Sequence, residues 1–191
     1  MDLETNQLKD LAGRDDQAAT IQLIELFYER VYAFLRRLAG SDADAADLTQ
    51  RTFSRVQQSL PTFAGRSSVS SWIHGIAYHT YIDWRRASRP TESRPDAWWE
   101  GFASGDAGPD EIVARDDFAK ALYTRVEGLE PELRESVHLH YYQGLTLQET
   151  ADAMGVAGST IKYRLRQAVA ELQKQLAGPP VPGTGANLRT V

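Results

Sequence analysis

The chain contains no cysteine among its 191 residues. Disulfide bonds and thiolate chemistry are therefore excluded, and a reducing cytoplasm fits this composition. No apolar run is long enough to span a bilayer, and the polar, acidic N-terminus lacks the basic and apolar parts of a signal peptide. These absences predict a cytoplasmic protein without membrane insertion.

Excess positive charge is also missing, because the formal net charge is -5. A protein that bound nucleic acid over its whole surface would be basic. Any contact with DNA should therefore be local, on a basic face of an otherwise acidic protein. Hydrophobic residues make up 42% of the chain, which is enough for real cores in one or two small domains. No internal repeat is evident.

Signatures of catalysis are missing as well. The sequence shows no convergent acid–base pair, no nucleophile motif and no glycine loop that cradles phosphate. His138 and His140 are two residues apart on an expected helix, so they point to different sides and make a poor metal pair. We therefore expect that the protein is not an enzyme and that it has neither a metal site nor a cofactor.

Helical periodicity is present almost throughout. Apolar residues at helical spacing predict a helix over residues 15–38, a second one capped by Ser41 and Asp44 that runs to about Leu60, and a third that begins at Ser71 or Trp72. A polar loop at 61–71 should separate the second and third helices.

Residues 90–110 turn acidic and rich in Gly, Pro and Ser, which is typical of a flexible linker. Helix should resume near Asp110 and continue to Ala177, and residues 178–191 are expected to form a disordered tail. The pattern predicts an all-α fold with two small helical domains, at 1–89 and 111–177, joined by a flexible acidic linker.

Gly144 to Leu176 has the pattern of a helix-turn-helix. Thr146 and Glu149 have the spacing of a capping box, so a helix should start there. A turn with Gly155 and Gly158 follows, and Ser159 or Thr160 can cap a second helix. The expected buried positions are Leu147, Thr150, Ala151 and Met154 in the first helix and Ile161, Leu165, Ala168, Val169 and Leu172 in the second.

The second of these helices carries a basic front. Its remaining positions, expected to be exposed, are Lys162, Tyr163, Arg164, Arg166 and Gln167. Cations and amide donors at the front of such a helix suit phosphate oxygens and base edges in a major groove, so this segment predicts DNA binding. The alternative is an ordinary helical hairpin with a solvated charged face.

Three motifs in order resemble those of the extracytoplasmic-function (ECF) sigma factors of the sigma-70 family. They are the run Asp-Ala-Ala-Asp-Leu-Thr-Gln-Arg-Thr-Phe at 44–53, the loop Phe-Ala-Gly-Arg-Ser-Ser at 63–68 with the helix from Trp72-Ile73 to Asp-Trp-Arg-Arg at 83–86, and the helix-turn-helix. The resemblance covers roughly 21–89 and 127–176.

The resemblance implies a specificity subunit that joins bacterial core RNA polymerase, directs it to promoter DNA and opens the duplex. Residues 1–89 would be sigma region 2 and residues 111–177 would be region 4. Region 2 would dock on the clamp helices of the beta-prime subunit, and region 4 would meet the beta flap. The polymerase-docking residues would be Asp44, Asp47, Gln50 and Phe53.

The resemblance also assigns two sets of DNA contacts. Those at the minus-35 element would be Ser159, Thr160, Lys162, Tyr163, Arg164 and Arg166. Those at the minus-ten element would be Phe63, Arg66, Ser67, Ser68, His79, Arg85 and Arg86, with the loop residues around a flipped base and the arginines on phosphates. As alternatives, Phe63 is a core plug, Arg85-Arg86 is a solvated helix end, and Trp72 and Trp84 are core residues.

Departures from the family pattern cluster in the docking helix. Ala46 and Arg51 stand where acidic residues are usual, so docking should be weaker than in the family. Tyr78-His79 replaces a common Arg-Asn pair, and Gln167 replaces a usual Arg.

Thr49 and Thr52 flank the altered patch, and a phosphate on either would restore roughly 1.5 to 2 negative charges. Some ECF subgroups with a non-acidic region 2.2 are controlled by Ser/Thr kinases, and this chain resembles them there. We therefore expect phosphorylation at Thr52 or Thr49. The alternatives are threonines with no role on a helix surface, or control by an anti-sigma factor.

Two other functions remain open from the sequence. One is a stand-alone helix-turn-helix transcriptional regulator that binds operator DNA as a dimer without polymerase. The other is a protein-interaction adaptor, which would be indifferent to the loss of Lys162, Arg164 and Arg166.

Overall fold

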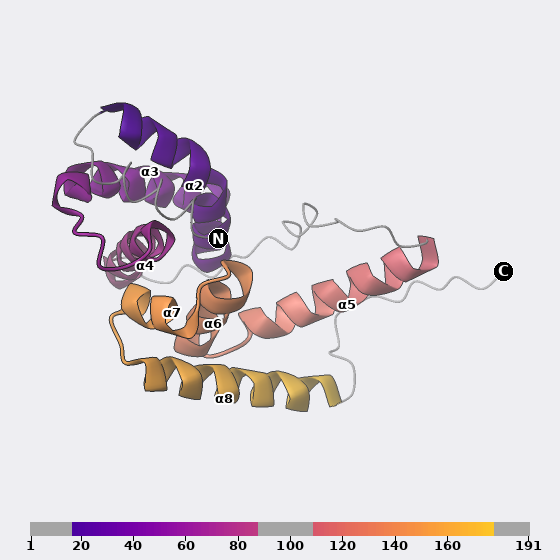
Figure 1. Cartoon of the computed structure of the whole chain (residues 1–191). Helices are drawn as coiled ribbons and strands as arrows, with labels where there is room; N and C mark the ends of the chain where they lie inside the picture. The colour runs from indigo at the N-terminus through magenta and orange to yellow at the C-terminus, as the bar shows by residue number, and fades with distance from the viewer. Residues whose placement is uncertain (1–16, 88–108, 178–191) are drawn as a thin grey trace.

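The computed structural model describes residues 17–87 and 109–177, which form helices joined by short turns and contain no strand (Figure 1). The all-α expectation is confirmed for these residues. The expected linker and tail lie outside the described residues, except that Pro109 and Asp110 already belong to a helix. None of the described helices is long and apolar enough to cross a membrane.

The first domain is a bundle of three helices, α2 (Gln17–Ala39), α3 (Asp42–Ser59) and α4 (Val69–Ala87), with a 3₁₀ turn, η1 (Leu60–Thr62), after α3. The side chain of Ser41 caps α3 as expected, because its Oγ accepts the amide hydrogen of Asp44 at 3.1 Å. The apolar stripes of the three helices meet in the middle of the bundle. The largest fully buried apolar side chains there are Leu23, Val31, Phe34, Leu35, Leu48, Leu60 and Ile73.

Helix α4 begins at Val69, earlier than the sequence indicated. Ser68 explains the difference, since its Oγ accepts the amide hydrogen of Ser71 at 3.1 Å and so satisfies a free donor of the first turn. The short polar loop at 63–68 therefore ends in a residue that caps the helix behind it.

The second domain comprises α5 (Pro109–Glu127), α6 (Pro131–Val137), a π-helical turn η3 (His138–Tyr142), α7 (Leu147–Met154) and α8 (Gly158–Ala177). Helices α6 and α7 both pack on α8. Their shared core includes Val126, Leu129, Val137, Leu139, Met154, Ile161, Leu165 and Ala168. Two expected core positions, Leu147 and Val169, are wrong, because 40% and 38% of their surfaces are exposed at the flanks of the apolar stripes.

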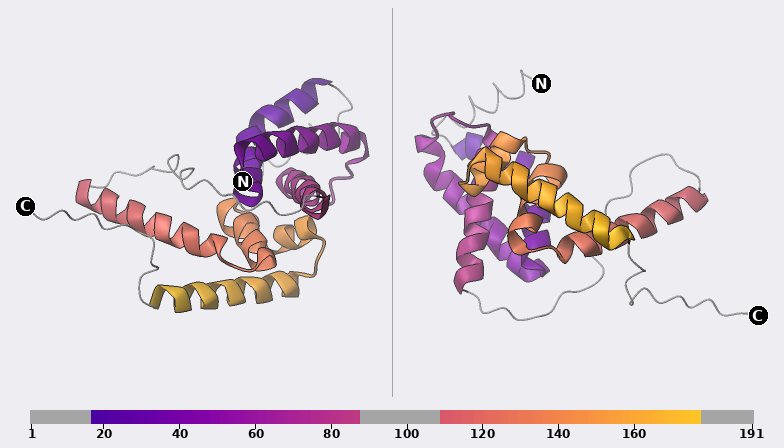
Figure 2. Two further views of the ribbon diagram at one scale, coloured as in Figure 1. Left: turned by 180° about the vertical axis from the view of Figure 1, so that it is seen from behind. Right: turned by 90° about the horizontal axis from the view of Figure 1, so that it is seen from below.

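The two domains are packed against each other. Helix α7 lies against α4, and η3 reaches α2, so that one continuous set of buried residues runs through both domains. Helix α8 lies on the far side of α6 and α7 from the first domain (Figures 1 and 2). This arrangement places some expected DNA-binding residues in the open and others at a contact between domains.

Candidate nucleic-acid interface

The helix-turn-helix is formed by α7 and α8. Thr146 and Glu149 make the predicted capping box, in which the Thr146 hydroxyl accepts the Glu149 amide hydrogen at 3.2 Å and the Glu149 carboxylate accepts the Thr146 amide hydrogen at 2.9 Å. Gly155 ends α7 with a φ of 67°, a left-handed conformation that favours glycine. The turn therefore follows from local sequence.

The start of α8 differs from the prediction. The helix begins at Gly158, and the Ala157 carbonyl accepts the amide hydrogens of Thr160 and Ile161 at 2.9 and 3.3 Å. Ser159 and Thr160 therefore lie inside the first turn, and the expectation that one of them caps the helix is wrong. Ser159 is exposed and Thr160 is half-buried.

The front of α8 carries the cations of the expected minus-35 reader. Lys162, Tyr163 and Arg166 are exposed on it, as is Gln167. Arg164 is different, because its guanidinium donates to the Glu132 carboxylate of α6 at 3.1 Å and only 16% of its side chain is exposed. Two of the three predicted cations are thus free to meet DNA, while the third is partly engaged inside its own domain.

The expected minus-ten loop connects η1 to α4. Phe63 is half-buried and its ring lies 4.6 Å from that of Trp72, centroid to centroid. Trp72 itself packs against the core, as does Trp84, in agreement with the core assignment. Gly65 turns the loop at a φ of 64°, and Arg66 beside it is exposed.

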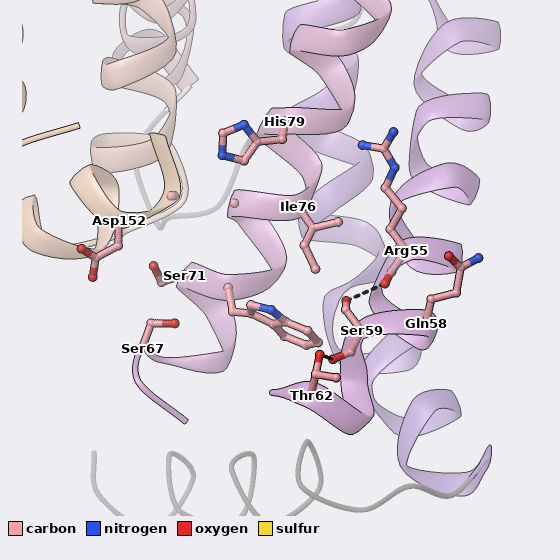
Figure 3. A pocket seen from close by; sticks show the side chains of 12 residues that line it. Arg55, Gln58, Ser59, Thr62, Ser67, Ser71, Ile76, His79 and Asp152 are labelled. Atoms are coloured by element: carbon pink, nitrogen blue, oxygen red, sulfur yellow. Dashed lines mark hydrogen bonds between the residues drawn. The ribbon is translucent and has the colours of Figure 1, made fainter. Parts of the chain in front are cut away.

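An open cavity of about 590 Å³ adjoins this loop (Figure 3). Its wall combines the apolar faces of Trp72 and Ile76 with hydrogen-bonding side chains. Its polar lining includes Arg55, Ser59, Thr62, Ser67 and His79 from the first domain and Asp152 from α7. A flat wall with polar groups around it is the kind of site that holds an unstacked base.

Arg85 and Ser68, two of the expected minus-ten residues, are already engaged. The Arg85 guanidinium donates to the Glu135 carboxylate of α6, and the Ser68 hydroxyl donates to the Glu149 carboxylate of α7. Tyr78 also donates to Glu135, at 2.9 Å. Arg86, the next residue after Arg85, is exposed.

Burial shifts the pKa values of Glu135, Tyr78 and Arg85, which meet between α4 and α6. Glu135 has no exposed surface, and burial raises its pKa, an effect that Arg85 and Tyr78 offset only in part. Burial also raises the pKa of Tyr78, and the Glu135 charge raises it further. Burial lowers the pKa of Arg85, but the Glu135 carboxylate together with Tyr81 and Tyr78 outweighs this and leaves that pKa above its usual value.

The expected polymerase-docking surface on α3 is only partly exposed. Asp47 and Gln50 are exposed and Asp44 is half-buried. Phe53 is not available for docking, because 6% of its surface is exposed and its ring stacks on that of Tyr28 at 6.2 Å. The sequence placed it on the surface because α3 alone does not reveal that α2 covers it.

Ala46 and Arg51, the two departures from the family pattern, both face solvent. Arg51 donates to Asp47 at 2.7 Å, four residues earlier on the same helix. Arg51 therefore lowers the negative charge of α3 in two ways. It stands where the family usually has an acid, and it pairs with the carboxylate of Asp47.

Thr49 and Thr52 are fully buried, each with 0% of its surface exposed. Their hydroxyls donate to the carbonyl oxygens of Ala45 and Leu48, both at 2.7 Å. The expectation of threonines on the surface of the docking helix is therefore wrong. A phosphate on either hydroxyl would need α3 to leave the bundle first.

The two histidines considered as a metal pair point apart, as expected. His138 is buried and its Nε2 lies 3.0 Å from Glu127, whereas the Nδ1 of His140 lies 2.6 Å from the Leu145 carbonyl oxygen. Within residues 17–87 and 109–177 no group of three His, Asp or Glu residues is placed to hold a metal ion.

Sequence reasoning missed Glu135, noted Tyr78 only as a departure from the family pattern, and gave Glu149 only the local role of a cap. No local pattern identifies these residues, because Tyr78 and Glu135 are 57 positions apart and meet only once the domains pack. In the sequence, Glu135 is a glutamate in a short helix, a pattern typical of a solvent-exposed charge.

Comparison with known proteins matches the two helical domains to two regions of one family. Residues 23–91 match the family model for Sigma-70 region 2, and residues 119–172 match that for Sigma-70, region 4. The ECF RNA polymerase sigma factor SigE of Mycolicibacterium smegmatis is 30% identical over 85% of this chain and 64% of its own length. The ECF RNA polymerase sigma factor SigX of Bacillus subtilis is 28% identical over 82% of this chain and 84% of its own.

A solved structure of CnrH in complex with the cytosolic domain of CnrY has a similar fold, with a TM-score of 0.65 and 20% identity over 90% of this chain and 96% of that one. Together, the two matched regions cover more than half of the sequence. The chain therefore belongs to the ECF sigma factors of the sigma-70 family. This family consists of transcription-initiation factors and not of enzymes, in agreement with the expectation.

Proposed function

We propose that this chain is a promoter-specificity subunit that reads two separate promoter elements with its two domains while bound to core RNA polymerase. The observation that carries this proposal is the presence, in one chain, of a helix-turn-helix with free cations and a helical bundle with a cavity beside an exposed loop. The helix-turn-helix suits contacts with double-stranded DNA, and the cavity of the bundle suits unstacked bases.

At the minus-35 element, α8 is the reading helix. Lys162 and Arg166 are exposed on its front and carry the charge that phosphates or guanine edges require. Tyr163 lies between them and is 58% exposed, so it adds a flat apolar contact to the same front. Arg164 joins them only if it releases Glu132.

At the minus-ten element, the loop at 63–68 and the cavity beside it hold an extruded base. Trp72 supplies a flat wall, and Ser67 and His79 supply hydrogen-bonding groups at the rim. Arg66 in the loop and Arg86 in the last turn of α4 are exposed and attract the backbone of the opened strand.

The exposed side of α3 docks on the clamp helices of the beta-prime subunit, and the second domain meets the beta flap. Charge on α3 sets the strength of docking. Asp47 is tied to Arg51, so the free protein presents little net negative charge there.

Activation by phosphorylation at Thr52 or Thr49 remains a prediction that requires the helix to open, because both hydroxyls are buried. Control by an anti-sigma factor needs no such opening.

The stand-alone dimeric regulator is the competing function. A regulator of that kind would bind promoter DNA as a dimer without polymerase, whereas a sigma factor depends on core polymerase for stable promoter binding. Sedimentation of the purified chain, combined with gel-shift assays on promoter DNA with and without core polymerase, separates the two. We expect a monomer whose promoter complex requires polymerase; a dimer that shifts DNA by itself would contradict the proposal.

A further inference from the structure

We propose that Gln167 is a specificity-determining residue on α8, and that its side-chain amide selects an adenine in the major groove of the minus-35 element. Tyr163, about one helical turn earlier, selects a nearby thymine through the methyl group of that base. The inference rests on the proposed function, since it takes α8 as the helix that enters the major groove.

Tyr163 and Gln167 lie on the side of α8 that points away from its own domain. Ile161, Leu165 and Ala168 are buried and mark the opposite side. Because successive residues turn by about 100° around a helix, both side chains point within about 50° of the direction away from the core. Both are exposed, and no other described helix covers this side of α8 (Figure 2). The pair is therefore the part of α8 that meets a groove first.

The cations of α8 flank this pair. Lys162 and Arg166 are four residues apart and form an exposed row on one side of it. Arg164 lies on the other side, where its guanidinium donates to the Glu132 carboxylate at 3.1 Å. Cations beside the central row of a recognition helix suit the phosphates that border a groove. Charge therefore positions α8 on DNA, and the neutral pair between the cations chooses the sequence.

The amide of Gln167 is free to bind a base. Two other glutamines of the helix-turn-helix are satisfied within their own helices, because Gln148 donates to Asp152 at 2.8 Å and Gln175 donates to Glu171 at 3.1 Å. Glu171 is four residues after Gln167, at the spacing its amide could reach, but Glu171 binds Gln175 instead. In the part of the chain that the structure describes, the Gln167 side chain has no hydrogen-bond partner.

A glutamine amide matches one base in the major groove. It offers an acceptor oxygen and a donor NH₂ group, and adenine presents the complementary N6 donor and N7 acceptor. Guanine presents two acceptors, N7 and O6, so it would leave the glutamine oxygen without a donor. A guanidinium in the same place would prefer guanine, because it offers only donors. Gln167 therefore favours adenine.

Tyr163 adds a second preference, for thymine. Four residues of α-helix rise about 6 Å, and base pairs are about 3.4 Å apart along B-DNA, so Tyr163 and Gln167 reach pairs about two steps apart. Thymine is the one DNA base that presents a methyl group in the major groove, and apolar side chains contact it there. Tyr163 is 58% exposed, so its ring is available for this contact.

The test compares the base preferences of matched variants. Core polymerase with the native chain selects duplexes from a pool of random sequence, and the selected duplex is then changed base by base in competition binding. We expect one position in the minus-35 element at which adenine is bound about tenfold or more tightly than guanine. Gln167→Arg should reverse this preference, and Gln167→Ala should abolish it.

Gln173→Arg adds the same charge at an exposed position further along α8 and is the matched control, which should keep the native preference. Tyr163→Ala should lose the preference for thymine about two steps from the adenine. Identical preferences in Gln167→Arg and the native chain would overturn the assignment of Gln167. A thymine preference that survives in Tyr163→Ala would overturn the assignment of Tyr163.

The same selection with the chain alone and with core polymerase alone separates this inference from the proposed function. Sequences that the chain enriches without polymerase, and that Gln167→Arg switches, would contradict the proposed function and support the base contact. Sequences that only the complex of chain and polymerase enriches, with no switch in Gln167→Arg, would support the function and overturn the base contact. Enrichment by neither would contradict both.

Discussion

Tyr78 of α4 donates its phenolic hydrogen to the buried carboxylate of Glu135 in α6, at 2.9 Å and across the boundary between the two domains. A hydrogen bond to a charged group contributes about 1.5 to 3 kcal/mol to stability. The contact therefore ties the stability of each domain to their packing against each other.

Tyr78→Phe should accordingly destabilise the chain by about 1 to 3 kcal/mol, because it leaves the Glu135 carboxylate with one donor fewer. Urea unfolding followed by circular dichroism measures this change. Tyr163→Phe, at an exposed position on α8, is the control and should have little effect. An identical midpoint for Tyr78→Phe and the native chain would show that the hydrogen bond contributes nothing.

Acid should weaken the fold through His74. Burial lowers the pKa of this side chain to about 4, opposed by the Ser70 carbonyl and Glu149 and assisted by Arg30. The unfolded chain takes up the proton near pH 6.5, so the contribution of His74 to stability is complete above that pH and is lost as pH falls toward 4. The full loss is about 3 kcal/mol.

Urea unfolding at a series of pH values between 7.5 and 4.5 measures this slope. We expect His74→Gln to flatten it, whereas His79→Gln, at an exposed position on the same helix, should leave it unchanged. Buried His138, whose pKa is also lowered by burial, accounts for a remaining slope. If His74→Gln keeps the native slope, His74 is not the acid-sensitive group.

On α8, Lys162→Ala and Arg166→Ala should weaken binding of polymerase holoenzyme to promoter DNA. Loss of a base contact costs about 1 to 3 kcal/mol, and loss of a phosphate contact reduces the salt dependence of binding by about one unit of slope. Arg164→Ala should act in the same direction, with part of its effect on the domain itself because Arg164 pairs with Glu132. Filter binding at several salt concentrations gives both quantities.

Lys174→Ala, an exposed cation in the last turn of the same helix, serves as the control for α8. Promoter binding that is unchanged in all three front variants would remove α8 as the minus-35 reader.

In the minus-ten loop, Arg66→Ala should permit closed-complex formation but impair opening of the duplex, because an exposed cation beside the cavity is lost. Phe63→Ala should do the same and also loosen Trp72, on which Phe63 packs. Permanganate reactivity of minus-ten thymines measures opening, with Gln57→Ala on α3 as an exposed control. Normal reactivity in both variants would assign these residues to the scaffold.

For polymerase docking, Arg51→Glu together with Ala46→Glu should tighten binding to core polymerase. The change adds two acids and frees Asp47 from its ion pair. Contacts of this kind gain from charge, so an increase of tenfold or more is expected by fluorescence titration. Gln57→Glu adds one acid further along α3 and should have a smaller effect. Native affinity equal to that of the double variant would mean that the departures at Ala46 and Arg51 carry no cost.

The sequence predicted those features that depend on neighbours along the chain. The capping box at Thr146 and Glu149 and the N-cap at Ser41 are local, and both were confirmed. The cap expected at Ser159 or Thr160 is also local but was wrong, because α8 begins at Gly158. The exposed front at Lys162 and Arg166 followed from helical periodicity.

Most of the features that failed depend on distant packing. Phe53, Thr49 and Thr52 lie on a side of α3 that α2 and α4 cover, so the helix alone suggested a surface where there is a core. Glu135 was missed for the same reason, because its partners come from another domain. Periodicity locates a buried stripe, but its width depends on how many neighbours surround the helix.

The central claim is that the chain directs core polymerase to particular promoters. Run-off transcription by core polymerase on fragments of the genome that encodes the chain, with and without the purified protein, tests it most directly. The account predicts discrete new transcripts that depend on the protein and that Lys162→Ala and Arg66→Ala each reduce. An unchanged set of transcripts, from a chain that nevertheless binds the same fragments in the absence of polymerase, would contradict it.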